Sequence, residues 1–166
     1  MKNLENINYL ERLKKTIELI SNSKDFNKTI LDLSESIISA NNSNKVVAIY
    51  GNGGSASDAQ HFSAELMGTY LKKDRKPYKS IALTTDTSFM TAWSNDFDFG
   101  SVFSRQIESL SSVIGLSIGL STSGKSENVI EALKLSNQKN IKTVLISGEK
   151  CPKYDFVDKV FRIPST

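Results

Sequence analysis

The sequence has little of what membrane and secreted proteins need. Among its 166 residues there is a single cysteine, Cys151, so an internal disulfide is excluded and a reducing compartment is favoured. No apolar run reaches the roughly 18 residues of a transmembrane helix. The N-terminal residues have mixed charge and lack the apolar stretch of a secretory signal. We therefore expect a cytoplasmic protein that does not bind a membrane.

Charge of one sign is also scarce. The 21 lysines and arginines are dispersed among 18 aspartates and glutamates, and the formal net charge is +3. No basic block with interleaved aromatic residues is present, which gives nucleic-acid binding little support. Hydrophobic residues make up 39% of the chain, enough to build a sizeable core at this length. The sequence therefore predicts a single domain over residues 1–166.

Two amphipathic helices are predicted within residues 1–43. Apolar residues recur in both at spacings of three and four: Leu10, Leu13, Ile17 and Ile20 in the first, and Phe26, Ile30, Leu33 and Ile37 in the second. Two interpretations are open. The helices form a hairpin that covers the sheet of their own domain, or they build a bundle shared between subunits. Stripes this narrow, placed ahead of a complete α/β unit, favour a role in oligomerisation.

Short apolar runs alternate with helical segments along the rest of the chain. Strands are predicted at 46–50, 80–83, 116–120, 142–146 and 159–163, and helices at 58–71, 87–94, 103–110 and 127–138, with a loop at 95–100. This alternation is typical of a parallel sheet with helices on both faces. We expect a Rossmann-like α/β fold with three layers, preceded by an N-terminal helical hairpin.

Two strand-to-helix turns carry the chemical signal, GNGGS at 51–55 and STSGKS at 121–126. Ligands of open α/β sheets bind outside the carboxyl ends of the strands, where both turns are expected. Free backbone N–H groups and the positive end of a helix dipole suit a phosphate there. The hydroxyls of four residues form a candidate cup for a phosphate monoester: Ser121, Thr122, Ser123 and Ser126. Neither turn matches the dinucleotide motif GxGxxG or the P-loop motif.

His61 and Glu65 lie four residues apart in the helix predicted after the first turn, so they share one helix face. One interpretation is a surface ion pair or a capping pair. The other is a catalytic carboxylate beside a histidine, with both binding a divalent metal, since zinc accepts both ligand types. Two ligands do not close a zinc site. Asn95 and Asp96, in the predicted loop, either cap a turn or contact substrate hydroxyls.

Three segments, in order, resemble the sugar isomerase (SIS) domain family and, within it, the phosphoheptose isomerases. They are GNGGSASDAQHFSAEL at 51–66, DTSFMTAWSNDFDFGSVFSRQIE at 86–108 and GLSTSGKSENV at 119–129. The resemblance implies an isomerase that converts sedoheptulose 7-phosphate to D-glycero-D-manno-heptose 7-phosphate through an enediol. The product would supply heptose for the bacterial surface, in lipopolysaccharide or capsule.

The same resemblance implies roles for individual residues. Substrate contacts would come from Asn52, Gly53, Gly54, Ser55, Glu65, Asn95 and Asp96, and phosphate contacts from Ser121, Thr122, Ser123 and Ser126. His61 and Glu65 fall at metal-ligand positions, implying one zinc per subunit, and Glu65 also falls at the catalytic carboxylate. The family is typically a homotetramer with sites between its subunits.

The sequence departs from the family pattern after Thr166. The family continues there into a C-terminal helix whose glutamine and histidine complete the site, and we expect that helix to be absent from this chain, whose only histidine is His61. An alternative of a different class is a SIS-domain adaptor that binds the bacterial replication initiator protein. Glu65 favours the enzyme, because an adaptor has no chemical need for that carboxylate.

Overall fold

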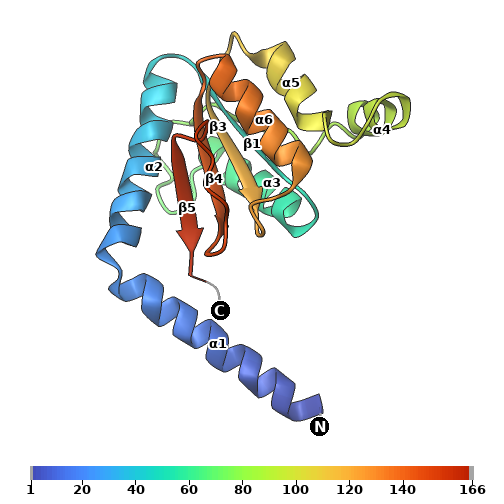
Figure 1. Cartoon of the computed structure of the whole chain (residues 1–166). Coiled ribbons are helices and arrows are strands. Elements are labelled where there is room, and N and C mark those ends of the chain that lie inside the picture. Colours follow the sequence, from blue (N-terminus) through green and yellow to red (C-terminus); the bar gives the residue numbers. More distant parts are fainter. Residues whose placement is uncertain (1, 165–166) are drawn as a thin grey trace.

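Five parallel strands form the centre of the computed structural model, which describes residues 2–164, with side chains from residue 8 onward (Figure 1). The strands are β1 (Val46–Gly51), β2 (Ser80–Ala82), β3 (Ile114–Ser121), β4 (Lys142–Gly148) and β5 (Lys159–Ile163). Their order is β2-β1-β3-β4-β5, so the chain leaves β1 toward one side and later returns to its other side. The carboxyl ends of β1 and β3 therefore flank the switch point where such sheets bind ligands. Met1, Ser165 and Thr166, part of the predicted domain span, lie outside the described residues.

The strands are apolar runs because the sheet is covered on both faces. The side chains of Val47, Ala48, Ile49 and Tyr50 are fully buried. Ile49 lies opposite Ile118 of β3, which in turn lies opposite Val144 of β4, so these three form a row across one face. The predicted strands are confirmed, with β3 and β4 two or three residues longer than the apolar pattern indicated and β2 one residue shorter.

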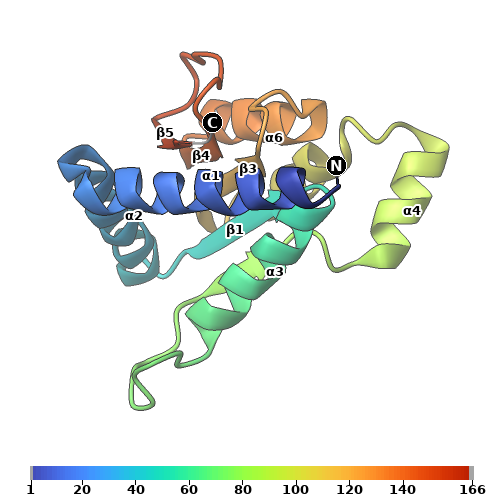
Figure 2. The ribbon, with the colours of Figure 1, turned by 90° about the horizontal axis from the view of Figure 1, so that it is seen from below.

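Helices cover the two faces and make the three predicted layers (Figures 1 and 2). On one face lie α2 (Lys24–Asn42) and α3 (Gly54–Met67), whose buried side chains join the row of Ile49, Ile118 and Val144. On the other lie α5 (Val102–Leu110) and α6 (Glu127–Gln138), around Phe103. The short α4 (Thr87–Asp96) projects beside α5. The predicted Rossmann-like α/β fold is confirmed.

The predicted N-terminal hairpin is wrong, because α1 (Lys2–Asn22) points away from the domain instead of folding back on α2 (Figures 1 and 2). Ser23 separates the two helices and accepts a hydrogen bond from the Phe26 N–H at 3.1 Å, which begins α2 in a new direction. The stripe of α1 is solvent-exposed, with Leu10 65% and Ile17 54% accessible. Only the stripe of α2 reaches the sheet.

Two predicted boundaries also change. The first helix after β1 begins at Gly54 rather than Asp58, and it ends at Met67 because Gly68 closes its last turn with a 2.7 Å hydrogen bond to the Ala64 carbonyl. The predicted loop at 95–100 is shorter, because α4 runs through Asp96. The Phe97 N–H donates to the Trp93 carbonyl at 2.9 Å, continuing the helical pattern past both predicted site residues.

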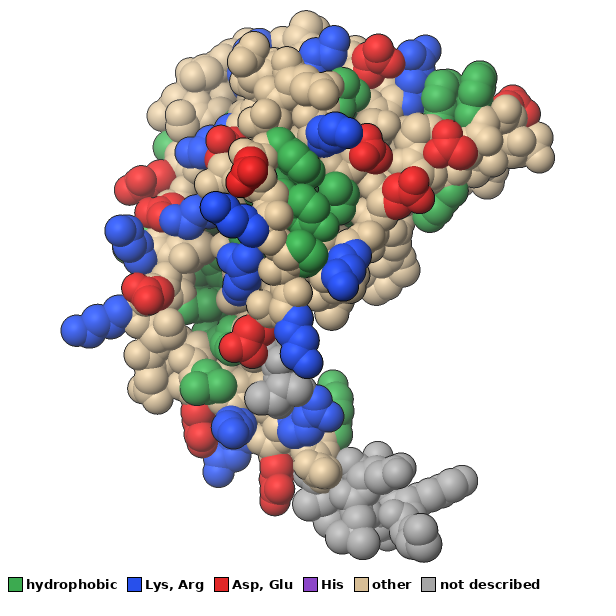
Figure 3. Space-filling model, viewed as in Figure 1, with side chains coloured by type: hydrophobic (Ala, Val, Ile, Leu, Met, Phe, Trp, Pro, Cys, Tyr) green, Lys and Arg blue, Asp and Glu red, His purple; other side chains and the backbone are tan. Residues whose placement is uncertain are grey.

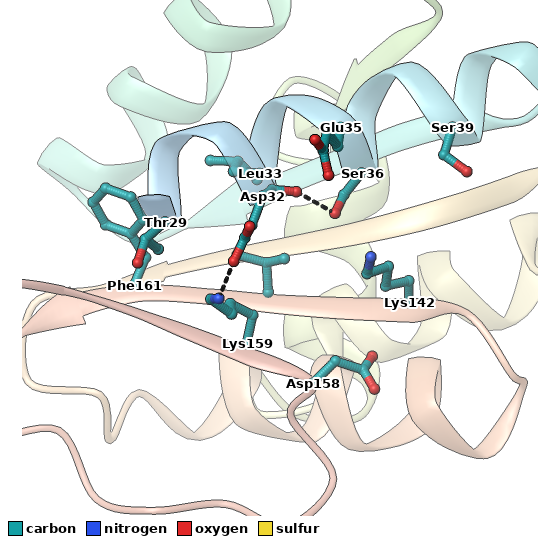
Figure 4. A pocket seen from close by; sticks show the side chains of 11 residues that line it. Thr29, Asp32, Leu33, Glu35, Ser36, Ser39, Lys142, Asp158, Lys159 and Phe161 are labelled. Atoms are coloured by element: carbon teal, nitrogen blue, oxygen red, sulfur yellow. Dashed lines mark hydrogen bonds and ion pairs between the residues drawn. The ribbon is translucent and has the colours of Figure 1, made fainter. Parts of the chain in front are cut away.

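A cavity of about 460 Å³ separates α2 from the amino ends of β4 and β5 (Figure 4). Asp32 of α2 forms an ion pair with Lys159 of β5 across it, and this cation holds the pKa of Asp32 below its usual value. Phe26 packs edge-on against Phe161 nearby, with ring centroids 4.8 Å apart. Asp32 thus attaches α2 to the sheet near the amino end of β5, and Phe26 attaches the first turn of α2 nearer the carboxyl end of the same strand.

The surface carries charges of both signs. On the face shown in Figure 3, lysines and arginines are interspersed with aspartates and glutamates, without an extended patch of one sign. Among the described helices, none combines the length and the apolar composition that a bilayer span requires.

Candidate active site

The two predicted turns meet at the carboxyl edge of the sheet. Gly51 at the end of β1 lies opposite Leu120 at the end of β3. A side chain at position 51 does not fit, because its Cβ would lie 2.8 Å from the Leu120 carbonyl oxygen. Beyond this contact, Asn52 and Asn128 exchange two hydrogen bonds, with Asn52 Nδ2 donating to Asn128 Oδ1 at 2.8 Å and Asn128 Nδ2 donating to Asn52 Oδ1 at 2.9 Å. The first turn is thus joined to the helix that follows the second.

The turn at 51–55 leaves open space above its backbone. Gly53 has a φ of +55°, a conformation that explains the glycine there. A Cβ built on Gly53 or Gly54 would meet no atom within 4 Å. The N–H groups of Ser55 and Ala56 donate to the carbonyls of Asn52 and Gly53 at 3.0 Å, so the N–H groups of Gly53 and Gly54, at the start of α3, are the ones left for a ligand. The local geometry leaves room for an anion at a helix N-terminus.

The turn at 121–126 is braced from several directions. Ser121 is 3% exposed, and its Oγ lies 2.9 Å from the Oγ of Ser126. Ser147 at the end of β4 donates its hydroxyl to the Ser121 carbonyl at 2.7 Å, and the Gly148 N–H donates to the Thr122 carbonyl at 3.0 Å. Thr122 and Ser123 are exposed at the rim of the turn. This chain therefore fixes the hydroxyl-rich turn without a ligand.

Tyr154 supports the same turn from behind. Its hydroxyl donates to the Gly124 carbonyl at 2.8 Å, while Gly124 itself has a φ of +67°. A Cβ at position 124 would lie 2.5 Å from Cys151 Sγ, so the turn and the segment after β4 are closely packed. Burial raises the pKa of Tyr154, and the nearby Cys151 raises it further. The phenol is therefore a protonated donor over the ordinary pH range.

Two cavities adjoin the turns and share a wall. The smaller, about 190 Å³, is lined by residues of both turns and of the β4 end, among them Ser55, Ser121, Thr122 and Ser147. The larger, about 520 Å³, is lined by His61 and Glu65 together with apolar residues of α3. Asp58 and Leu120 line both cavities. The hydroxyl-rich turn and the α3 face that carries Glu65 are therefore neighbours.

His61 is exposed and Glu65 is half-buried, and both line the larger cavity. Within the described part of the chain, neither side chain forms a hydrogen bond or an ion pair, so the surface ion pair that the spacing allowed is not formed. No group of three or more histidine, cysteine, aspartate or glutamate side chains among the described residues could hold a metal ion. His61 and Glu65 offer ligand types that zinc accepts, but these residues supply only part of a zinc site.

Arg75 holds the end of α3 that carries Glu65. Its guanidinium donates to the carbonyls of Glu65 at 2.7 Å, Gly68 at 2.6 Å and Leu66 at 3.1 Å. It also lies over the ring of Tyr78, 4.9 Å from the ring centroid. The last carbonyls of a helix have no partner within the helix, and a cation there satisfies them. Arg75 thereby fixes the backbone of the turn from which Glu65 projects.

Asn95 and Asp96 are not brought to either cavity. Both are exposed on the last turn of α4, where Asn95 Nδ2 donates to Asp96 Oδ1 at 2.9 Å. The chain approaches the site only later, at Gly100, where a Cβ would lie 3.2 Å from the Glu127 side chain at the start of α6. The contact of Asn95 and Asp96 with a substrate stays a prediction.

Sequence reasoning missed three residues of this edge. Asn128 was quoted inside the third motif without a role, although an asparagine in the first turn of a helix beside a second asparagine-containing turn was an available signal. Asp58, in the predicted α3, lines both cavities. Arg75 lies in an irregular segment after α3, and its sequence position gave no sign that it returns to the helix end.

Comparison with known proteins agrees with this arrangement. The SIS domain family matches residues 8–148. Over 103 residues the chain is 55% identical to phosphoheptose isomerase 1 of Campylobacter jejuni, covering 62% of this chain and 55% of that protein. It is 43% identical over 137 residues to the phosphoheptose isomerase of Aquifex aeolicus, covering 82% and 71% respectively. The chain thus spans little more than half the length of some of the curated relatives that it matches.

Solved structures give the same result for the fold. The structure of a phosphoheptose isomerase from Neisseria gonorrhoeae superimposes with a TM-score of 0.75 at 31% sequence identity, covering 99% of this chain and 86% of that one. The family match, the identities and this superposition agree with the paired turns at the sheet edge. The chain belongs to the SIS domain family, and the curated relatives that it matches there include phosphoheptose isomerases.

Proposed function

We propose that this protein is a sugar-phosphate isomerase that converts sedoheptulose 7-phosphate to D-glycero-D-manno-heptose 7-phosphate. One observation carries the proposal: the hydroxyl-rich turn and Glu65 line two cavities that share Asp58 and Leu120. A seven-carbon sugar phosphate has its phosphate at one end and its reacting carbons at the other. Adjoining cavities suit such a molecule, with the phosphate held at 121–126 and the C1–C2 edge beside α3.

The chemistry requires one proton to move between adjacent carbons. In the ketose, a base removes a proton from C1 and the C2 carbonyl oxygen takes up a proton, which gives the enediol. The base then returns its proton to C2 while O1 loses its proton and the C1 aldehyde forms, so that the net change moves one proton from C1 to C2 and one from O1 to O2. Glu65 is the candidate base, because it is a carboxylate in the larger cavity whose side chain is not engaged in an ion pair with a described residue. The turn at 51–55 supplies the backbone N–H groups of Gly53 and Gly54 beside the sugar, since the Asn52 amide and the Ser55 N–H are engaged within the chain.

We also propose that His61 and Glu65 are two ligands of one zinc ion per subunit, the others coming from outside the described residues. When bound, zinc would polarise the substrate carbonyl. The donor types support this assignment, whereas the ligand count among the described residues is insufficient alone. Equilibrium dialysis with zinc, comparing the parent with His61→Ala, tests it, and equal zinc content in both would contradict it.

The exposed stripe of α1 supports a further proposal, that the protein is a homotetramer assembled through its N-terminal helices. Leu10, Leu13 and Ile17 are each about half or more exposed, which is unfavourable unless another surface covers them. Light scattering should give about four times 18.4 kDa. Leu13→Lys should shift the mass downward, and a parent that is a monodisperse monomer at micromolar concentration would exclude the proposal.

The proposed setting is the bacterial cytoplasm, where the product would enter the synthesis of surface heptose for lipopolysaccharide or capsule. The adaptor alternative is not favoured, because the matched relatives are isomerases and Glu65 lies in a cavity rather than on a flat surface. The decisive experiment incubates the chain with sedoheptulose 7-phosphate and follows the aldose signal by NMR. Calorimetry on the same preparation separates a failure to bind from a failure to turn over, and absence of both would reject the proposed function.

A further inference from the structure

Within the described residues, the Asn52–Asn128 pair is the only hydrogen-bonded side-chain link between the turn at 51–55 and the helix that follows the turn at 121–126. Asn52 follows β1 and Asn128 lies in the first turn of α6, 76 residues later. Asn128 is 2% exposed, whereas Asn52 is half-buried. Each amide donates one hydrogen bond to the other and accepts one in return, so the two amide groups are held at a fixed separation.

Such a pair resists the loss of either member. If Asn52 is removed, the Asn128 amide is left buried and unsatisfied, which costs the desolvation of that group. If both are removed, no orphaned amide remains. The two positions should therefore be strongly non-additive, as expected for residues that act through one contact.

The pair also lies where its geometry affects a ligand. Asn52 precedes Gly53 and Gly54, whose Cβ positions face open space. Asn128 lies two residues after Ser126, whose hydroxyl faces Ser121. A molecule that touches both turns senses their separation, whereas a small anion that touches only the turn at 121–126 does not.

We infer that Asn128 is a positioning residue: through Asn52 it sets the distance and orientation of the 51–55 turn relative to the hydroxyl-rich turn, so that one sugar phosphate reaches both. The inference rests on the proposed function for its ligand. It gives Asn52 a role that differs from the direct substrate contact implied by the family resemblance, because its amide is already engaged by Asn128.

The test compares Asn52→Ala, Asn128→Ala and the double variant with the parent, using Asn137→Ala at the far end of α6 as the matched control. Calorimetry measures the Kd for sedoheptulose 7-phosphate and for inorganic phosphate. Each single variant should weaken sugar-phosphate binding by roughly tenfold, the double variant by no more than either single, and the control not at all. Binding of inorganic phosphate should change by less than about threefold.

Three results would overturn the inference. They are additive losses of affinity in the double variant, equal weakening of sedoheptulose 7-phosphate and inorganic phosphate binding, or weakened sugar-phosphate binding in Asn52→Ala with unchanged binding in Asn128→Ala. The last would make Asn52 a direct ligand. If Asn128→Ala does not fold, Asn52→Ala still decides, since the positioning role requires that it spare inorganic phosphate binding and speed hydrogen exchange at the Ser55 and Ala56 amides.

A ligand-independent measurement separates this inference from the proposed function. The Ser55 and Ala56 amides donate at 3.0 Å to the carbonyls of Asn52 and Gly53, so they report on the 51–55 turn. Hydrogen exchange at both should be roughly tenfold faster in Asn128→Ala than in Asn137→Ala. If the parent fails to bind sedoheptulose 7-phosphate, the proposed function falls while this readout still tests the pair. Unchanged exchange in Asn128→Ala would refute the positioning role.

Discussion

The two halves of the candidate site are built differently. The hydroxyl-rich turn is supported on every side by this chain, with Ser121 buried, Ser147 and Gly148 bonding to its backbone, and Tyr154 behind it. The half on α3 is open: His61 is exposed, and Glu65 projects into a cavity of about 520 Å³. Only the backbone of its last turn is fixed, by Arg75.

This difference separates binding from chemistry. A preformed turn binds an anion without losing conformational entropy on binding, because its hydroxyls and N–H groups are already held in place. The side chains of His61 and Glu65 on α3 are available to bind a substrate or a metal, since neither forms a hydrogen bond or an ion pair with a described residue. Variants in the turn should therefore alter affinity, and variants on α3 should alter turnover, in the same molecule.

The largest expected effect breaks the open half alone. Glu65→Gln keeps the shape of the side chain but removes its basicity, so turnover should fall by about 10²–10⁴-fold, the usual contribution of a general base. Affinity for sedoheptulose 7-phosphate should change little, because the phosphate contacts come from the other half. Turnover and Kd measured on one preparation check this.

Glu131→Gln is the matched control, since Glu131 is half-exposed on α6 and pairs only with Lys134. Turnover of Glu65→Gln within a few-fold of the parent would make Glu65 merely structural. Loss of binding together with turnover would instead assign Glu65 to positioning the substrate or the metal, and the comparison of the two halves would fail.

The next effect breaks the preformed half. Replacing Ser121 and Ser123 with alanine removes one buried and one exposed hydroxyl from the turn. Binding of sedoheptulose 7-phosphate should weaken by roughly 1–3 kcal/mol, the range for hydrogen bonds to a charged group. Calorimetry measures the change, with Ser34→Ala on α2 as the control. Unchanged affinity in the double variant would show that the turn is a tight connection and nothing more.

The turns of the candidate site could be predicted from the sequence, but the contacts that hold them could not. The turns could be found, because glycine and serine clusters directly after predicted strands are local signals, and a parallel sheet places them at one edge. The bracing of Ser121 by Ser147 could not, because it depends on the register of β3 and β4. Arg75 and Asn128 act through contacts between segments distant in sequence, which periodicity does not report.

The N-terminal helices show the same limit. Both carry stripes with equal spacing, yet α2 buries Ile37 on the sheet while α1 leaves Leu10 65% exposed. A stripe shows that a helix has an apolar face but not which surface covers it. Asn95 and Asp96 were misplaced in a loop for a related reason, because the Asp86 cap, which accepts from the Phe89 N–H at 2.9 Å, begins a helix long enough to include them.

A smaller effect is expected at the one support that the α3 half has. Arg75→Met removes the guanidinium from the carbonyls of Glu65, Leu66 and Gly68, leaving them to water. The free energy of unfolding should fall by about 1–3 kcal/mol, and turnover should fall more than phosphate affinity does, since only the Glu65 turn loosens. Urea denaturation and steady-state kinetics measure both quantities.

Arg105→Met is the control for Arg75→Met, because Arg105 is half-exposed, pairs with Glu108 on its own helix and lies over the Trp93 ring, 5.1 Å from its centroid, as Arg75 lies over Tyr78. It should change stability by less than about 1 kcal/mol. If Arg75→Met lowers stability without lowering turnover, the arginine caps the helix but does not position Glu65. Equal losses of turnover and phosphate affinity would instead indicate a general loosening of the domain.

The smallest effect sharpens the comparison at the back of the preformed turn. Tyr154→Phe removes the hydroxyl that donates to the Gly124 carbonyl, so the free energy of unfolding should fall by about 0.5–1.5 kcal/mol. The pH dependence of this loss of stability identifies its cause.

The pKa of Tyr154 is raised above 10.0 in the folded protein, so folding favours the protonated phenol. Its contribution is fully present below pH 10 and declines as the pH rises through the raised pKa. The stability difference between parent and variant should therefore be constant from pH 6 to 9, shrinking only in more alkaline solution. Urea denaturation across this range measures it, with Tyr9→Phe on the exposed α1 as the control. A difference that already varies between pH 6 and 9 would mean that another group titrates with the turn, and the bracing of the preformed half would not rest on this phenol.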